Sequence, residues 1–169
     1  MKAIIVLVMH GVPPNNFPKR EMAELFSLHA RMEGAVGVER VMLERRRLEL
    51  DTKMRAWPRT AQNDPFYAGS QELAAHLSEA TGCEVIVGFN EFCAPSLDEA
   101  LSQAIAREAE KVIVITPMMT RGGEHSEVDI PAAVQAAQAK HPEAQILYVW
   151  PFEISDVANF LAAHIVSLI

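Results

Sequence analysis

The sequence predicts an α/β domain built on a four-stranded parallel sheet flanked by helices. Four short apolar runs rich in β-branched residues have the length and composition of buried parallel strands. Helical patterns separate the later runs, and strands that alternate with helices indicate a parallel sheet with right-handed crossovers. The length of 169 residues matches about one domain at roughly 150 residues per domain. We therefore expect one domain over residues 1–169.

The first expected strand opens the chain and ends at a His-Gly pair. It faintly resembles a signal peptide, but His10-Gly11 follows it in place of a small-residue cleavage site. No run approaches the ~18 unbroken apolar residues that a membrane span needs. We therefore expect a cytoplasmic protein with no membrane insertion. The four expected strands are Ala3–Met9, Glu84–Phe89, Lys111–Thr116 and Gln145–Trp150.

Helix-start signals follow the second, third and fourth strands. Ser96, with Glu99 three residues later, forms a capping box. Asp129 precedes Ile130 and Pro131 and is expected to cap the next helix, because proline is tolerated in a first turn. The last helix is expected to begin near residue 155 or 156 and to continue to residue 169.

The connection between the first two strands is too long for a single crossover. A complete strand–helix–strand unit needs only about 30 residues, whereas this connection runs from His10 to Glu84. We therefore expect a helical insertion over about residues 16–68. The helices expected in the connection lie at about Pro18–Glu33, Val38–Trp57 and Ser70–Thr81.

Charge is distributed unevenly along the chain. Fifteen basic and 22 acidic residues give a net charge of −7, which disfavours nucleic-acid binding through a globally basic surface. Residues 37–59, however, hold seven basic and four acidic side chains. This segment reads either as a solvated helix with surface ion pairs or as a basic flap that faces an anionic ligand or a partner subunit.

The two cysteines do not indicate a disulfide scaffold. Cys83 and Cys93 stand at opposite ends of one extended segment, so an intrachain disulfide between them is not expected. Cys93 follows Glu91 by two residues and could be a soft metal ligand. A small buried thiol is the favoured interpretation.

Polar side chains follow three successive strands at the edge where ligands bind in an open α/β sheet. They are His10, Glu91 and His125. Two neutral imidazoles and one carboxylate suit Fe²⁺, Co²⁺, Ni²⁺ or Zn²⁺, and histidine can also accept protons near neutral pH. The sequence therefore predicts a divalent-metal and proton-transfer site.

The segments beside this edge suggest contacts to a flat, acidic ligand. The glycines allow close approach of the backbone, and an arginine can grip a carboxylate through paired hydrogen bonds. Surface charge and core packing are the alternative roles for the arginine and the apolar residues. No phosphate-loop motif is present. The candidate substrate-binding residues are Arg121, Gly122, Gly123, Met118, Met119 and Phe92.

Three segments together resemble the class II tetrapyrrole metal chelatases, specifically the small sirohydrochlorin cobaltochelatase and ferrochelatase type (CbiX/SirB-like). The segments are Val6–Gly11, Val87–Leu97 and Val112–Pro131, and the last carries a signature similar to Gly-Gly-His…Asp-Ile-Pro. The resemblance implies one chelatase-like lobe. It also implies that His10 and His125 are the active-site histidines and that Glu91 joins them at the metal.

The activity implied by the resemblance is a lyase-type chelatase reaction. A divalent metal, Co²⁺ or Fe²⁺ with Ni²⁺ as a further candidate, would be inserted into sirohydrochlorin or a related tetrapyrrole in cobalamin- or siroheme-type biosynthesis. The metal would be a substrate, and no permanent cofactor is expected. Because larger chelatases resemble two facing lobes, a single lobe is expected to form a homodimer.

Two departures from the family pattern support an alternative. Glu124 separates Gly123 from His125, and the insertion after the first strand is unlike compact members of the family. A non-catalytic metal or tetrapyrrole carrier of the same fold therefore stays open. A hydrolase that uses His10 as a base is disfavoured, since no nucleophile elbow is recognisable.

Overall fold

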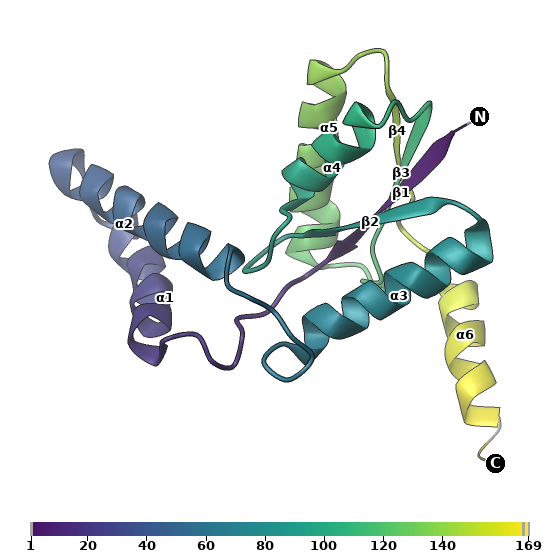
Figure 1. Cartoon of the computed structure of the whole chain (residues 1–169), viewed down its shortest axis with the longest axis horizontal. Helices are drawn as coiled ribbons and strands as arrows, with labels where there is room; N and C mark the ends of the chain where they lie inside the picture. Colours follow the sequence, from purple (N-terminus) through teal and green to yellow (C-terminus); the bar gives the residue numbers. More distant parts are fainter. Residues whose placement is uncertain (1, 167, 169) are drawn as a thin grey trace.

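The protein is an α/β lobe with a helical arm on one side (Figure 1). The computed structural model describes residues 2–166 and residue 168, except the side chain of His29. All four strands are parallel, in the order β2-β1-β3-β4. The strands are β1 (Ala3–Met9), β2 (Glu84–Phe89), β3 (Lys111–Ile115) and β4 (Gln145–Tyr148). The predicted fold class is confirmed, and the third and fourth strands end one and two residues earlier than expected.

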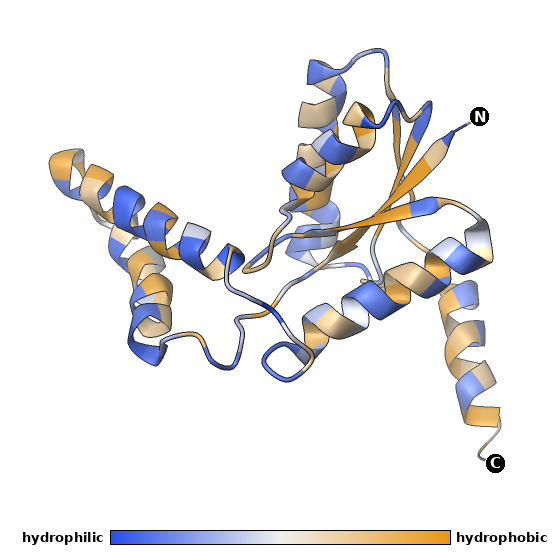
Figure 2. Ribbon diagram, viewed as in Figure 1, coloured by the Kyte–Doolittle hydropathy of each residue, from blue (hydrophilic) through white to orange (hydrophobic). Residues whose placement is uncertain are grey.

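Strand alternation divides the core between the two faces of the sheet. On β1, Ile4, Val6 and Val8 pack with α4 (Leu97–Ala106) and α5 (Ile130–Lys140), whereas Leu7 and Met9 face α3 (Pro65–Thr81). The strands are accordingly the most continuously hydrophobic segments (Figure 2). Burial on both faces explains why each strand reads as an unbroken apolar run.

Helix α3 begins five residues earlier than the sequence pattern suggested. Asp64 caps it by accepting a hydrogen bond from the Tyr67 amide at 2.8 Å, and Pro65 occupies the first turn. The sequence pattern does not reveal this start, because apolar periodicity is weak over the first turn of α3. At the other end Gly82 adopts φ +68°, as a helix C-terminus favours.

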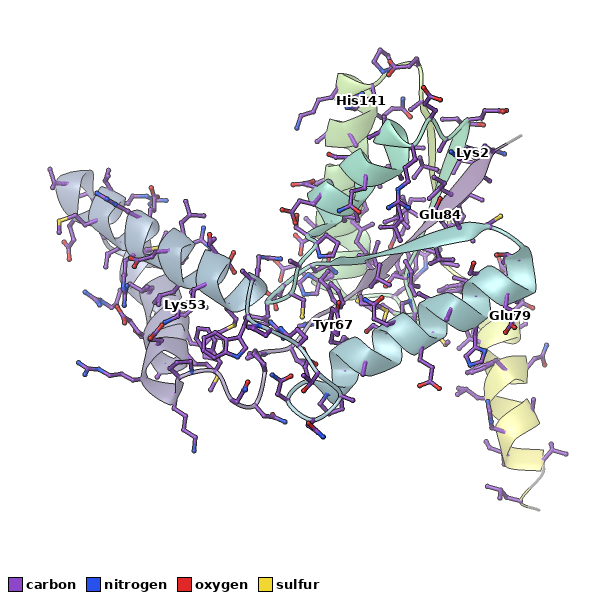
Figure 3. The ribbon with its side chains drawn as sticks, in the orientation of Figure 1. Lys2, Lys53, Tyr67, Glu79, Glu84 and His141 are labelled. Atoms are coloured by element: carbon purple, nitrogen blue, oxygen red, sulfur yellow. The ribbon has the colours of Figure 1, made fainter. Side chains whose placement is uncertain are left out.

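The expected insertion forms a helical hairpin of α1 (Lys19–Glu33) and α2 (Gly37–Arg55). The two helices enclose a hydrophobic cluster of their own, whose buried members include Phe17, Leu28 and Leu50. Ion pairs join them on the outside, such as Lys53 to Glu21. Lys53 is labelled beside the two helices in Figure 3. The solvated-helix interpretation is thus confirmed for much of α2. At its C-terminal end, however, Arg55 donates hydrogen bonds to the loop that follows β2.

The last helix, α6 (Ile154–Val166), projects away from the lobe (Figure 1). It carries no buried residue among those described. The predicted extension to Ile169 falls partly on residues 167 and 169, which lie outside the described residues. Within the described part of the chain, no helix is both long and apolar enough to cross a membrane.

Candidate metal centre

Three side chains meet beyond the carboxyl ends of β1, β2 and β3. One ligand atom each from His10, Glu91 and His125 lies within 4.8 Å of the others. Small side-chain rotations would bring such atoms to the ~2.1 Å that divalent metals take from nitrogen or oxygen ligands. The structure therefore brings together the three residues that the sequence placed at this edge, although they are separated by up to 115 positions (125 − 10 = 115).

Backbone hydrogen bonds carry the β1–β2 pairing past the strands and fix His10 beside Glu91. The Asn90 amide donates to Met9 O at 3.0 Å, and the Glu91 amide donates to His10 O at 2.9 Å. Gly11 makes this approach possible. It adopts φ +90°, and a Cβ there would lie 1.9 Å from the Glu91 carbonyl oxygen. The His-Gly pair is therefore a geometric requirement of the site.

The hydrogen bonds of His10 leave one nitrogen for a metal. His10 Nδ1 lies 2.7 Å from Gly11 O, and because a carbonyl oxygen can only accept, Nδ1 carries the donated proton. The neutral ring then presents its lone pair on Nε2, which lies 3.8 Å from Glu91 Oε2. The side chains of His10 and Glu91 are 48% and 42% exposed, so the centre is open to ligands.

His125 is held by a carboxylate partner. Its Nδ1 donates to Asp129 Oδ2 at 2.6 Å, so in the neutral ring Nε2 again faces outward with its lone pair. The rings of His10 and His125 lie edge to face, with centroids 4.8 Å apart. A carboxylate behind a ligating histidine fixes the tautomer and the orientation of the ring. Asp129 is thus a further residue of the candidate site, which the sequence reasoning missed.

The expected capping role of Asp129 is wrong. The helix begins one turn earlier, as the π-helical segment η1 (His125–Asp129), and Asp129 makes no cap hydrogen bond. Short π-helical segments often mark functional sites. The four-residue spacing between His125 and Asp129, which places two side chains on one helical face, was the available signal.

Tyr148 supports the same segment from β4. Its hydroxyl donates to the Ser126 carbonyl at 3.0 Å, immediately after His125. Burial raises the pKa of the Tyr148 phenol to about 12, so the hydroxyl stays protonated and remains a donor at neutral pH.

The six candidate substrate-binding residues do not form one surface. Arg121 is exposed and lies over the Trp150 ring at 5.8 Å. Met118 packs against the core, and Met119 lines an apolar pocket with Phe152. Gly122 and Gly123 lie in the exposed turn before His125.

Phe92 lies on the hairpin side of the centre, whereas Cys93 packs with the sheet face that α3 covers. Phe92 packs against the hairpin cluster and contacts Phe26 edge to face, with centroids 5.9 Å apart. Cys93 is fully buried, and burial raises the pKa of its thiol. Its Sγ faces Val12 O and Asp64 rather than the three metal-site residues. The interpretation as a small buried thiol is confirmed, and Cys83 is also free.

Two arginines from the insertion, Arg55 and Arg59, donate hydrogen bonds to backbone carbonyls of the loop that carries Glu91. We call this pair the arginine clamp. Arg55 donates to Asn90 O at 3.0 Å and to Cys93 O at 2.9 Å. Arg59 is buried, pairs with buried Asp64 and donates to the carbonyls of Val12, Met54 and Phe92. Sequence analysis missed this clamp, because the charge count gave no sign of contacts to residues more than 30 positions away.

The chain matches one family model and one curated protein. The model of the CbiX family matches residues 61–165, which is more than half of the chain. A curated sirohydrochlorin cobaltochelatase of Priestia megaterium is 33% identical over 70 residues, or 41% of this chain. That match spans only 22% of the relative's length.

One solved structure is similar in fold, and a second gives a weaker match. A putative cobalamin (vitamin B12) biosynthesis CbiX protein from Marinobacter aquaeolei VT8 matches with a TM-score of 0.52 and 16% identity, over 98% of this chain and 94% of that one. The sirohydrochlorin chelatase SirB from Bacillus subtilis subspecies spizizenii, solved in complex with cobalt, matches at 0.44 and 15% identity. The latter match covers 89% of this chain and 44% of that one.

Proposed function

The chain belongs to the CbiX family, and we propose that it is a chelatase that inserts a divalent metal, Co²⁺ or Fe²⁺, into sirohydrochlorin or a related tetrapyrrole. The observation that carries the proposal is the convergence of His10, Glu91 and His125 at the strand edge. The reaction belongs to cobalamin- or siroheme-type biosynthesis in the cytoplasm. The metal enters as substrate, and Ni²⁺ is a further candidate.

The geometry of the site suits the chemistry of metal insertion. The metal-free ring gives up two pyrrole N–H protons as the divalent ion enters, so charge and protons balance. The Nε2 atoms of His10 and His125 can bind the ion or accept these protons. The Glu91 carboxylate offsets the charge of the metal, and Asp129 fixes the orientation of His125. These are the catalytic and metal-binding roles that we assign.

An insertion assay tests the proposal. Purified protein is incubated with excess sirohydrochlorin and Co²⁺, Fe²⁺ or Ni²⁺, and incorporation is followed by absorbance. We expect many turnovers per chain with at least one metal and loss of turnover in His125→Ala. Absence of turnover with every combination of metal and tetrapyrrole would contradict the proposal.

A metal or tetrapyrrole carrier is the second candidate function. The exposed Glu124 carboxylate directly before His125 favours the metal carrier, because an added negative charge at that position attracts a cation and opposes the approach of an anionic tetrapyrrole. A carrier would retain a stoichiometric amount of ligand without turnover. The same assay, read with limiting and then excess tetrapyrrole, separates the two functions.

We also propose that a second copy of the chain completes the site. His10 and Glu91 are about half exposed, so one wall of a tetrapyrrole cleft is open. Helix α6 exposes Phe160, Leu161 and Ile165, which gives the lobe an apolar surface for a partner copy. Sedimentation at assay concentration should show a homodimer, and a strictly monomeric protein with full activity would contradict this.

A further inference from the structure

A cavity lies between the helical hairpin and the loop that carries Glu91. Its volume is about 630 Å³, and its walls include Phe26 from α1, Arg47 and Arg55 from α2, and Glu91 and Phe92 from the loop. Cavities of roughly 300–1,000 Å³ are the usual size of small-molecule sites. Since Glu91 also belongs to the metal centre, the cavity directly adjoins that centre.

Most basic side chains of α2 are already neutralised by a neighbouring carboxylate. Arg45 and Arg47 have no ion-pair or hydrogen-bond partner within the described part of the chain, and of the two only Arg47 lines the cavity. The Asp51 carboxylate in the same wall is occupied by Arg55, at 2.9 Å. Arg47 is therefore a free cation at the rim of the cavity. The paired side chains are Arg40 with Glu44, Arg46 with Glu24 and Glu49, Lys53 with Glu21, and Arg55 with Asp51.

The apolar part of the wall is aromatic and accessible. Phe26 is 51% exposed and meets Phe92 edge to face. Phe92 itself has φ +57°, a left-handed conformation that is unusual for a bulky residue and common at binding sites. An exposed aromatic surface beside a free guanidinium suits a flat conjugated ring with ionised side arms.

The loop also holds an unpaired donor. Asn90 Nδ2 is buried and has no hydrogen-bond partner among the described residues, although Asn90 lines the same cavity. A buried donor without an acceptor destabilises the folded state. A ligand that offers carboxylate oxygens would supply an acceptor in this part of the cavity.

We infer that this cavity takes one edge of the tetrapyrrole, with a peripheral carboxylate of the ring paired to Arg47 and the ring edge against Phe26 and Phe92. The inference rests on the proposed chelatase function and adds a role for the insertion. The sheet edge holds the metal, and the hairpin recognises the acidic rim of the macrocycle.

Binding of metal-free uroporphyrin, a porphyrin rich in peripheral carboxylates, tests the inference. Its dissociation constant is measured by fluorescence for wild type, Arg47→Gln and Arg45→Gln. Arg45 is the matched control, since it is an exposed arginine of α2 that does not line the cavity. We expect Arg47→Gln to weaken binding about tenfold, the loss of one charged hydrogen-bonded contact, and Arg45→Gln to bind like wild type.

Two further readouts separate the possible outcomes. The Co²⁺ affinity of Arg47→Gln should equal that of wild type, because Arg47 is not part of the metal cluster. Equal uroporphyrin affinity in wild type and Arg47→Gln would overturn the inference and leave the chelatase proposal intact. If wild type neither binds uroporphyrin nor inserts metal into sirohydrochlorin, the proposed function fails and the inference fails with it.

Discussion

The metal edge of the lobe and the α1–α2 hairpin are built in different ways. At the metal edge, backbone hydrogen bonds extend the β1–β2 pairing and set His10 against Glu91. The hairpin has a separate hydrophobic cluster and grips the lobe through Arg55 and Arg59. The sheet therefore pre-forms the candidate metal centre, whereas the hairpin is attached by the contacts of these two arginines and by the packing of Phe92 against its cluster. Metal binding and hairpin attachment should respond to different substitutions.

The largest effect is expected at Gly11, where the metal edge has no room for a side chain. Gly11→Ala should abolish Co²⁺ binding and lower the free energy of unfolding by about 3 kcal/mol or more, because a Cβ would collide with the Glu91 carbonyl. Calorimetric titration and urea denaturation measure the two effects. Gly34→Ala is the control, since nothing lies within 4 Å of a Cβ there. Wild-type cobalt affinity in Gly11→Ala would refute the close-approach argument.

The next effect concerns the attachment of the hairpin. Arg59→Met leaves the fully buried Asp64 carboxylate without its cation, and breaking a buried pair in this way costs about 3–5 kcal/mol. Urea denaturation should show this loss, with partial recovery in the Arg59→Met/Asp64→Asn double variant. Arg40→Met removes an exposed pair with Glu44 and should cost no more than about 1 kcal/mol. Equal losses in Arg59→Met and Arg40→Met would mean that the clamp does not attach the hairpin.

A smaller effect, confined to the metal edge, is expected at Asp129. Asp129→Asn weakens the support of His125, so Co²⁺ affinity should fall about 10–100-fold while the free energy of unfolding changes little. Glu143→Gln alters another carboxylate beside a histidine, His141, and should leave cobalt affinity unchanged. If Asp129→Asn bound cobalt as wild type does, Asp129 would have no part in orienting His125.

The smallest effect is expected at Tyr148. Tyr148→Phe removes the hydrogen bond to Ser126 O and should lower the free energy of unfolding by about 1 kcal/mol at neutral pH. The folded-state pKa of Tyr148 is raised to about 12, so the unfolded chain loses this proton first, near pH 10. The stabilising contribution of the hydroxyl is therefore complete below about pH 10 and is lost as the pH rises toward 12.

Urea denaturation of wild type and Tyr148→Phe across this alkaline range measures the effect. The difference between the two proteins should shrink as the pH rises, because the phenylalanine variant lacks the titrating group. A constant difference would contradict the assigned shift.

The lobe was easier to predict than the contacts of the hairpin, for a physical reason. Buried parallel strands are unbroken apolar runs, and parallel strands bring their carboxyl ends to one edge. Those two rules placed His10, Glu91 and His125 together. The clamp of Arg55 and Arg59 on residues 90–93 depends on how the hairpin folds back, and local charge patterning carries no such information.

Calorimetric titration with Co²⁺ tests most directly whether His10, Glu91 and His125 form the metal centre. Wild type should bind one ion per chain, and His125→Ala should lose measurable binding. His76→Ala, which replaces an exposed histidine of α3, should bind as wild type does. Retention of the wild-type stoichiometry and affinity in His125→Ala would contradict the assignment of the metal to the strand edge.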